Sequence, residues 1–213
     1  MVLDILRREK LFLKPEKCTF DAQEVEYLGM IIHPGQVAMD PAKLKGISEW
    51  PHPTTVKETR SFLGFCNFCR HFIANYSDLA RPMIDLTKKD HVLAWTDACQ
   101  GTFDALKKQF LSEPVLKNLD PLRQFTLATD ASLFATGAVL LQTNGNGSYH
   151  PCGYLSQSLN PTEHNYQIYD HKLLAVIHTL KVWRHFLEGN PHPVIVFTDH
   201  QNLLYFRSAQ KLT

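Results

Sequence analysis

The sequence lacks three features that would assign it to a class directly: a long apolar run, a regular cysteine framework and an excess of charge of one sign. Its apolar runs stay well below the roughly 20 residues that span a bilayer. Five cysteines are an odd number without regular spacing, which favours reduced thiols over a disulfide framework. The net charge of +1 does not by itself indicate a nucleic-acid binder. The N-terminal residues do not have the layout of a signal peptide. We therefore expect an intracellular protein, in the cytoplasm or nucleus, with no membrane partner.

The composition is that of a globular protein. The chain has 213 residues, 44% of them hydrophobic and 20% charged. This length allows one large domain or two small ones.

Residues 1–40 are predicted to hold a helix over 2–13 that Pro15 ends. Two strands follow, over 17–20 and 25–32, with a turn between them and a second turn at Pro34-Gly35. So few strands are not stable alone in water, so this part is expected to be the end of a larger unit.

Residues 41–113 have a helical pattern throughout. A short helix runs from Pro41 to Trp50, and Thr55 with Glu58 fits a capping box for the next one. That helix is expected to bury one apolar face, made of Phe62, Phe65, Cys66, Cys69, Phe72 and Ile73. Two further helices are predicted. One starts at Ser77 or Asp78 and runs to Leu86; the other follows Thr96 and turns Phe103, Leu106, Phe110 and Leu111 inward.

The pattern changes to strands after residue 121. Strands are predicted over 123–130, 135–142 and 149–156, followed by a long helix over 165–187 and a buried strand over 193–198. The fold class is therefore mixed α/β: a β-hairpin, an all-helical part, and a mixed sheet with helices.

Asp130 and Asp199 are the strongest candidate site residues, because each follows a threonine at the end of a predicted strand. Parallel neighbouring strands would bring both carboxylates to one sheet edge, where ligands bind in open α/β sheets. Two adjacent carboxylates repel each other without a cation, and Mg²⁺ favours oxygen ligands. The alternative is two aspartates in turns that cap helices.

Other candidate groups have simpler explanations. Cys66-x-x-Cys69-x-His71 resembles part of a zinc or redox motif, but no second ligand pair stands elsewhere, so buried thiols are favoured. An aromatic set on the long helix is suited to base stacking, although core packing is favoured for most of it: Tyr166, Tyr169, Trp183, His185 and Phe186. His200 is equally suited to a catalytic role and to a place beside a helix N-cap.

Seven blocks of sequence, in order, resemble the Pol polyprotein of gypsy-type LTR retrotransposons. They are residues 13–20 (LKPEKCTF), 25–29 (VEYLG), 50–64 (WPHPTTVKETRSFLG), 95–96 (WT), 129–132 (TDAS), 137–140 (GAVL) and 198–203 (TDHQNL). The resemblance covers nearly the whole chain. It implies that residues 1–40 end a reverse transcriptase palm, 41–118 form the helical thumb and connector, and 119–213 form an RNase H-like domain truncated at its C-terminus.

The resemblance also implies functions for particular residues. Lys57, Arg60 and Arg70 would contact the phosphates of an RNA–DNA or DNA duplex without reading its sequence. Asp130 and Asp199 would be catalytic and Mg²⁺-binding carboxylates of a ribonuclease H. The remainder of a Pol polyprotein would be a partner of the chain.

Three departures from the family pattern predict that this chain is inactive alone. The polymerase motif Tyr-x-Asp-Asp would precede residue 1, and the fourth ribonuclease H carboxylate and fifth strand would follow residue 213. The helix carboxylate of the family falls on Lys172, and Asp170 lies about 200° round the helix from that position. An ammonium there repels metal ions and can pair with Asp130 or Asp199, so we expect weak or absent Mg²⁺ binding. The alternatives are an active ribonuclease H completed by the missing segments, and a protein-interaction fragment.

Overall fold

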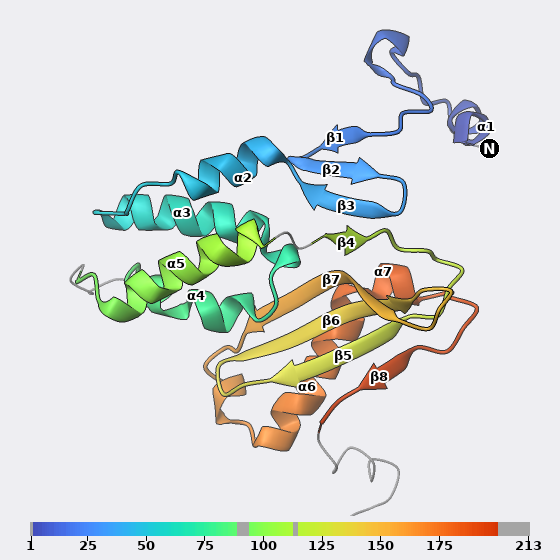
Figure 1. Ribbon diagram of the computed structural model, residues 1–213. Coiled ribbons are helices and arrows are strands. Elements are labelled where there is room, and N and C mark those ends of the chain that lie inside the picture. Colours follow the sequence, from blue (N-terminus) through green and yellow to red (C-terminus); the bar gives the residue numbers. More distant parts are fainter. Residues whose placement is uncertain (1, 89–93, 113–114, 200–213) are drawn as a thin grey trace, which may run out of the picture.

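The computed structural model describes residues 2–88, 94–112 and 115–199. Within these ranges it has two four-stranded sheets, one of order β1-β2-β3-β4 and one of order β7-β6-β5-β8. A block of helices lies beside both sheets, and two more helices lie behind the second one (Figure 1). The predicted mixed α/β class is confirmed.

The N-terminal part differs from its prediction in three ways. Its elements are α1 (Val2–Arg8), the short 3₁₀ helix η1 (Pro15–Lys17), β1 (Val25–Tyr27), β2 (Met30–His33) and β3 (Gln36–Met39). The helix is shorter than predicted, and residues 18–20 form no strand. The apolar run over 25–32 is a hairpin and not one strand, because Leu28 and Gly29 turn the chain with positive φ angles of 51° and 73°.

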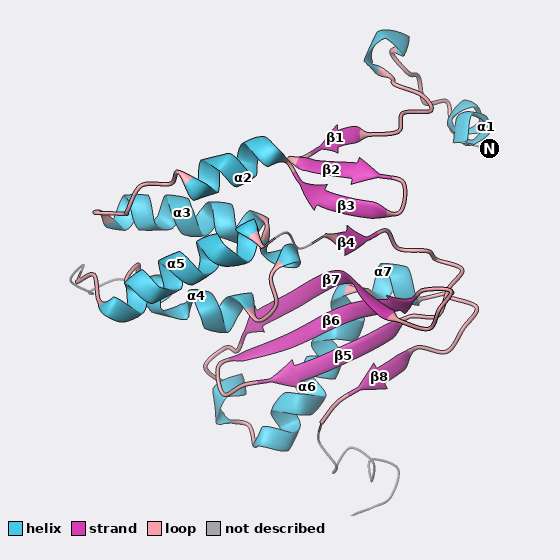
Figure 2. Ribbon diagram, in the orientation of Figure 1, coloured by secondary structure: helices cyan, strands magenta, loops and turns pink. Residues whose placement is uncertain are grey.

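The all-helical part contains α2 (Pro41–Ser48), α3 (Val56–Phe68), η2 (Arg70–Phe72), α4 (Tyr76–Asp85) and α5 (Asp97–Leu111), which Figure 2 shows as one group of cyan helices. The hydroxyl of Thr55 caps α3 by accepting from the Glu58 amide, as predicted. The Glu58 carboxylate reaches back and accepts from the amide of Thr54 at 2.7 Å. Thr96 caps α5 as predicted.

The core of the helical part is the apolar face predicted for α3 together with its partners on α4 and α5. Phe62, Cys66, Leu106 and Phe110 are fully buried in it. Leu111, which was predicted to point inward, is 46% exposed because it lies at the C-terminal end of α5. Helix α4 starts at Tyr76, with Asn75 at its N-cap position, so both predicted caps are displaced.

The chain then returns to the first sheet before it builds the second. Strand β4 (Leu116–Lys117) pairs antiparallel with β3. The second sheet and its helices are β5 (Thr126–Ala131), β6 (Ala135–Thr143), β7 (Tyr149–Ser158), η3 (Glu163–Asn165), α6 (Ile168–Val182), α7 (Arg184–Leu187) and β8 (Ile195–Phe197). Strand β8 lies parallel to β5, as expected for two strands whose ends meet.

Helices α6 and α7 lie on one side of the second sheet (Figure 1). They cover a core that includes Phe125, Leu127, Leu140 and Trp183. Of the five aromatic residues considered for base stacking, Trp183 alone is buried. Core packing, which was favoured for most of this set, is therefore wrong for the other four, which are exposed: Tyr166, Tyr169, His185 and Phe186. Strand β8 is not buried as predicted, since Val196 and Phe197 are 36% and 47% exposed at the edge of the described sheet.

Helix α4 attaches the helical part to the second sheet. The Ser77 amide donates to Ser156 Oγ on β7 at 2.9 Å. The guanidinium carbon of Arg81 stands 3.3 Å from the centroid of the Phe134 ring, in the turn between β5 and β6. No helix within the described ranges is both long and apolar enough to cross a membrane.

Candidate functional site

Asp130 and Asp199 lie side by side at the same edge of the second sheet. The parallel register pairs Ala128 with Phe197, and each aspartate stands two residues further along its chain. Thr129 supports this end of the sheet, because its hydroxyl donates to the Phe197 carbonyl at 3.3 Å. The aspartate side chains are 68% and 70% exposed. The expected juxtaposition of the two carboxylates is therefore present.

Lys172 of α6 places its ammonium between these two carboxylates. It donates a hydrogen bond to Asp130 Oδ1, and it stands 2.9 and 3.0 Å from the two carboxylate oxygens of Asp199. The lysine side chain is only 10% exposed, so its stem is buried and its charged end reaches the sheet edge. Burial opposes the charge of Lys172, but the hydrogen bonds to both aspartates outweigh burial and raise the pKa of the lysine.

This arrangement does not fit a divalent ion held by carboxylates. The position between Asp130 and Asp199 is held by a cationic group of the chain itself, and an ammonium has no lone pair with which to ligate a metal. The described residues also contain no group of three or more His, Cys, Asp or Glu side chains arranged to hold a metal. A two-metal mechanism needs more oxygen ligands than the described part of the chain presents at this edge.

A cavity of about 470 Å³ opens in front of the two carboxylates. It is bounded by Asp130 and Asp199, by apolar and aromatic side chains of the sheet including Tyr154 and Phe197, and by Asn75 from the helical part. Asn75 was not identified from the sequence. Its φ of 53° lies in the left-handed region, and its side-chain amide makes no capping hydrogen bond to α4. Asparagine tolerates this conformation, and an asparagine directly before a helix is the available signal.

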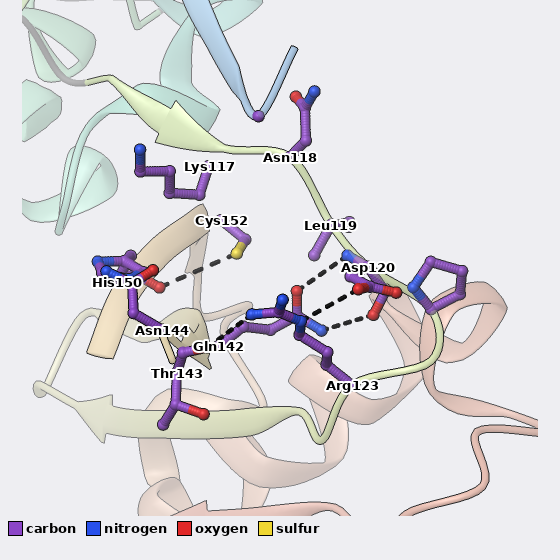
Figure 3. Close-up of a pocket in the computed structure, with 12 residues that line it drawn as sticks. Lys117, Asn118, Leu119, Asp120, Arg123, Gln142, Thr143, Asn144, His150 and Cys152 are labelled. Carbon is purple, nitrogen blue, oxygen red and sulfur yellow. Dashed lines mark hydrogen bonds and ion pairs between the residues drawn. The ribbon is translucent and has the colours of Figure 1, made fainter. Parts of the chain in front are cut away.

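A second cleft of similar volume lies between the first sheet and the second sheet, beside the segment that follows β4 (Figure 3). Its polar groups bind one another: Asp120 and Gln142 exchange two hydrogen bonds, at 2.9 and 2.8 Å, and Arg123 pairs with Asp120. Burial raises the pKa of the Cys152 thiol in this cleft to about 11. These hydrogen bonds therefore attach the segment after β4 to the second sheet. The residues that line the cleft include no pair of carboxylates.

The predicted basic residues lie in the helical part. Lys57 and Arg60 are exposed on α3, and Arg70 is exposed on η2, just beyond the helix end. Arg60 is partly engaged, because it donates to the Thr87 carbonyl at 2.7 Å. The same exposed side of α3 contains Gly64 and Phe68. A Cβ at Gly64 would have no atom within 4 Å, and Phe68 is 48% exposed. Neither was identified from the sequence as a surface residue.

The cysteine motif is not a surface site. Cys66 and Cys69 are 0% and 2% exposed, which agrees with the buried-thiol interpretation, and burial raises the pKa of both thiols. Burial also lowers the pKa of His71, whose ring lies 4.3 Å from that of Phe72. Neither thiol is therefore accessible at the surface. His200, the remaining candidate, lies outside the described residues.

Residues 95–196 match the family described as an RNase H-like domain found in reverse transcriptase. Among curated proteins, the Tf2-3 and Tf2-4 transposon polyproteins of Schizosaccharomyces pombe are each 36% identical to this chain over 203 residues. The similarity covers 95% of this chain and 15% of each polyprotein. The chain thus spans a small part of the length of these relatives.

Solved structures share the fold. A foamy viral protease-reverse transcriptase dRH in complex with double-stranded DNA superimposes with a TM-score of 0.72 and 22% identity, covering 96% of this chain and 36% of that one. A foamy viral protease-reverse transcriptase in complex with an RNA/DNA hybrid gives 0.70 and 21%, covering 93% and 27%. The arrangement of helical part and second sheet is therefore one that occurs in reverse transcriptases.

Proposed function

Since residues 95–196 match the RNase H-like domain found in reverse transcriptase, we propose that this chain is a segment of a gypsy-type retrotransposon Pol polyprotein that binds a nucleic-acid duplex and does not cleave it. In this proposal residues 1–40 are the end of the palm, 41–118 the thumb and connector, and 119–213 the RNase H-like domain. The polyprotein similarity over 95% of the chain supports the assignment. The rest of such a polyprotein is the proposed protein partner.

The proposed duplex-binding surface is the exposed side of α3 with η2. Lys57, Arg60 and Arg70 supply cationic groups for phosphates, which position a duplex without reading its sequence. Gly64 leaves the centre of this side without a side chain, so that a backbone can approach closely. Phe68 offers an apolar ring beside it, with the Lys43 ammonium 4.7 Å from the ring centroid. Complexes of the foamy viral structures with DNA and with an RNA/DNA hybrid make a duplex the natural ligand to test.

The observation that carries the absence of cleavage is the contact of Lys172 with both Asp130 and Asp199. In the proposed active form of the site, these aspartates would hold Mg²⁺. The two carboxylates together carry a charge of −2. With the Lys172 ammonium between them the three groups carry −1, and the position that an ion would take is occupied. The residues present therefore do not support metal-dependent hydrolysis.

Duplex binding is tested by fluorescence anisotropy of a labelled RNA–DNA hybrid titrated with the full chain at several salt concentrations. The variant Lys57→Ala/Arg60→Ala is expected to bind about tenfold more weakly at low salt, with a salt dependence reduced by about two phosphate contacts. The matched control is Lys45→Ala/Lys108→Ala, which removes two exposed lysines from α2 and α5. Equal binding by wild type and the α3 variant would overturn the assigned surface, and absence of binding by wild type would favour a protein-interaction fragment.

A further inference from the structure

We infer that Lys172 is a built-in cation that holds α6, β5 and β8 together, so that this edge of the sheet needs no divalent ion for its stability. The inference rests on the proposed assignment of Asp130 and Asp199 as the site carboxylates. It goes beyond the absence of cleavage, because it gives the altered site a structural role that can be measured without any activity.

The side chain of Lys172 is held in one position by the protein around it. This side chain is 10% exposed, whereas the carboxylates it meets are 68% and 70% exposed. The stem is thus enclosed by protein, and only the ammonium emerges, where it meets carboxylate oxygens from two different strands. Charge-assisted hydrogen bonds of this kind are about twice as strong as neutral ones.

Strand β8 depends on few other contacts among the described residues. Its register with β5 consists of three residue pairs. Two side chains assist it from the β5 side: Thr129 donates to the Phe197 carbonyl, and Gln124 donates to the Pro193 carbonyl at 3.0 Å. Its exposed Val196 and Phe197 contribute little burial. A contact at the Asp199 end therefore adds to the few described contacts that keep this strand on the sheet.

Electrostatics favour the contact of Lys172 with both aspartates. Asp130 and Asp199 are brought together by the strand register, and without a nearby cation two adjacent carboxylates disfavour the folded state. Lys172 offsets this repulsion with one positive charge and hydrogen bonds to both groups. A divalent ion could enter only if the ammonium left, and the buried stem would then lose its position. Removal of the lysine, in contrast, would leave a pair of carboxylates able to take up a cation.

The test is the thermal unfolding of the full chain, followed by circular dichroism in EDTA and with Mg²⁺ or Mn²⁺ at about 10 mM. Wild type is expected to unfold at the same temperature, within about 1 °C, in all three conditions. Lys172→Glu places three carboxylates at the edge. It is expected to unfold at least about 4 °C lower than wild type in EDTA and to recover about 3 °C or more with Mn²⁺.

Two further variants complete the test. Lys181→Glu makes the same charge change at an exposed position near the other end of α6, away from the carboxylates, and is expected to show no cation response. Lys172→Gln removes the charge without adding a carboxylate. It keeps the test decisive if Lys172→Glu does not fold: a lowered unfolding temperature in EDTA is expected, with partial recovery in Mn²⁺.

A cation-dependent rise in the unfolding temperature of wild type, lost in Asp130→Asn, would overturn the inference. So would unchanged stability of both Lys172 variants in EDTA. These results are separate from the proposed function, which fails if the hybrid is not bound or is cleaved.

Discussion

Ser132 donates a hydrogen bond from Oγ to Oδ1 of Asp78 at 2.9 Å, across 54 residues of sequence. Asp78 lies on α4 of the helical part, and Ser132 lies in the turn that directly follows the strand of Asp130. The same serine hydroxyl accepts from the amides of Phe134 and Ala135 and so fixes the turn itself. Two more contacts lie between the helical part and this region: the Ser77–Ser156 hydrogen bond and the Arg81 guanidinium against the Phe134 ring. The helical part therefore holds in place the loop beside the candidate site.

Asp78→Ala should lower the free energy of unfolding by about 1 kcal/mol, because it removes a hydrogen bond to a charged group at a half-buried seam. Wild type should unfold in urea in one transition, seen both by circular dichroism and by tryptophan fluorescence, since the two parts share this seam. The control is Asp104→Ala on α5, whose side-chain partner Gln100 is only one helical turn away. Separate transitions in wild type would contradict the shared seam.

Gly137→Ala tests the close approach of Asn75 to the second sheet. A Cβ at residue 137 would stand 2.9 Å from Asn75 Oδ1, while its other neighbours are at ordinary contact distances. Since the end of a side chain can rotate away, the expected loss is below about 1 kcal/mol in urea unfolding. Gly137→Ala should cost less in an Asn75→Gly background, where glycine also keeps the left-handed backbone accessible. An equal cost in both backgrounds would show that Asn75 does not lie against Gly137.

His178 gives the chain an acid-sensitive contact. Its ring Nδ1 is 3.1 Å from the Thr136 hydroxyl, and burial, opposed by the nearby Glu163 carboxylate and reinforced by Lys181, lowers its pKa below the ordinary value of about 6.5. The unfolded chain therefore takes up a proton more readily than the folded chain. The free energy of unfolding should fall as the pH drops below about 6.5 and level off below the folded pKa.

The measurement is a series of urea titrations between pH 7.5 and pH 5, compared with His178→Gln. The variant should lose part of this pH dependence. The remaining part is expected from His71, since its pKa is also lowered by burial. A chemical shift of the His178 ring that titrates at or above the ordinary pKa would contradict this explanation.

The placement of the main site residues could be predicted from sequence because it depends on local rules. Threonine-aspartate pairs at the ends of apolar runs predicted strand ends, and the parallel pairing of β5 with β8 brought Asp130 and Asp199 together. The position of Lys172 came from the resemblance to the Pol polyprotein, and helical periodicity served only to reject Asp170 as its substitute. The division into domains and the role of each site residue remain predictions.

Features that depend on tertiary context were missed. Strand β4 has two residues, too few for any pattern, and exists because β3 offers an edge. The hairpin within 25–32 was missed because Leu28, not a usual turn residue, takes a positive φ. Asn75 reaches the site cavity from the other part of the molecule, which local periodicity does not indicate.

The most direct test of the proposal that this chain does not cleave nucleic acid is a cleavage assay. It uses a labelled RNA–DNA hybrid and the full chain in Mg²⁺ or Mn²⁺. Because the Lys172 ammonium lies between Asp130 and Asp199, no product should form above the level without protein. Lys172→Glu should also remain inactive, since the described residues place no further carboxylate beside Asp130 and Asp199. Cleavage by wild type that disappears in Asp130→Asn would contradict the account.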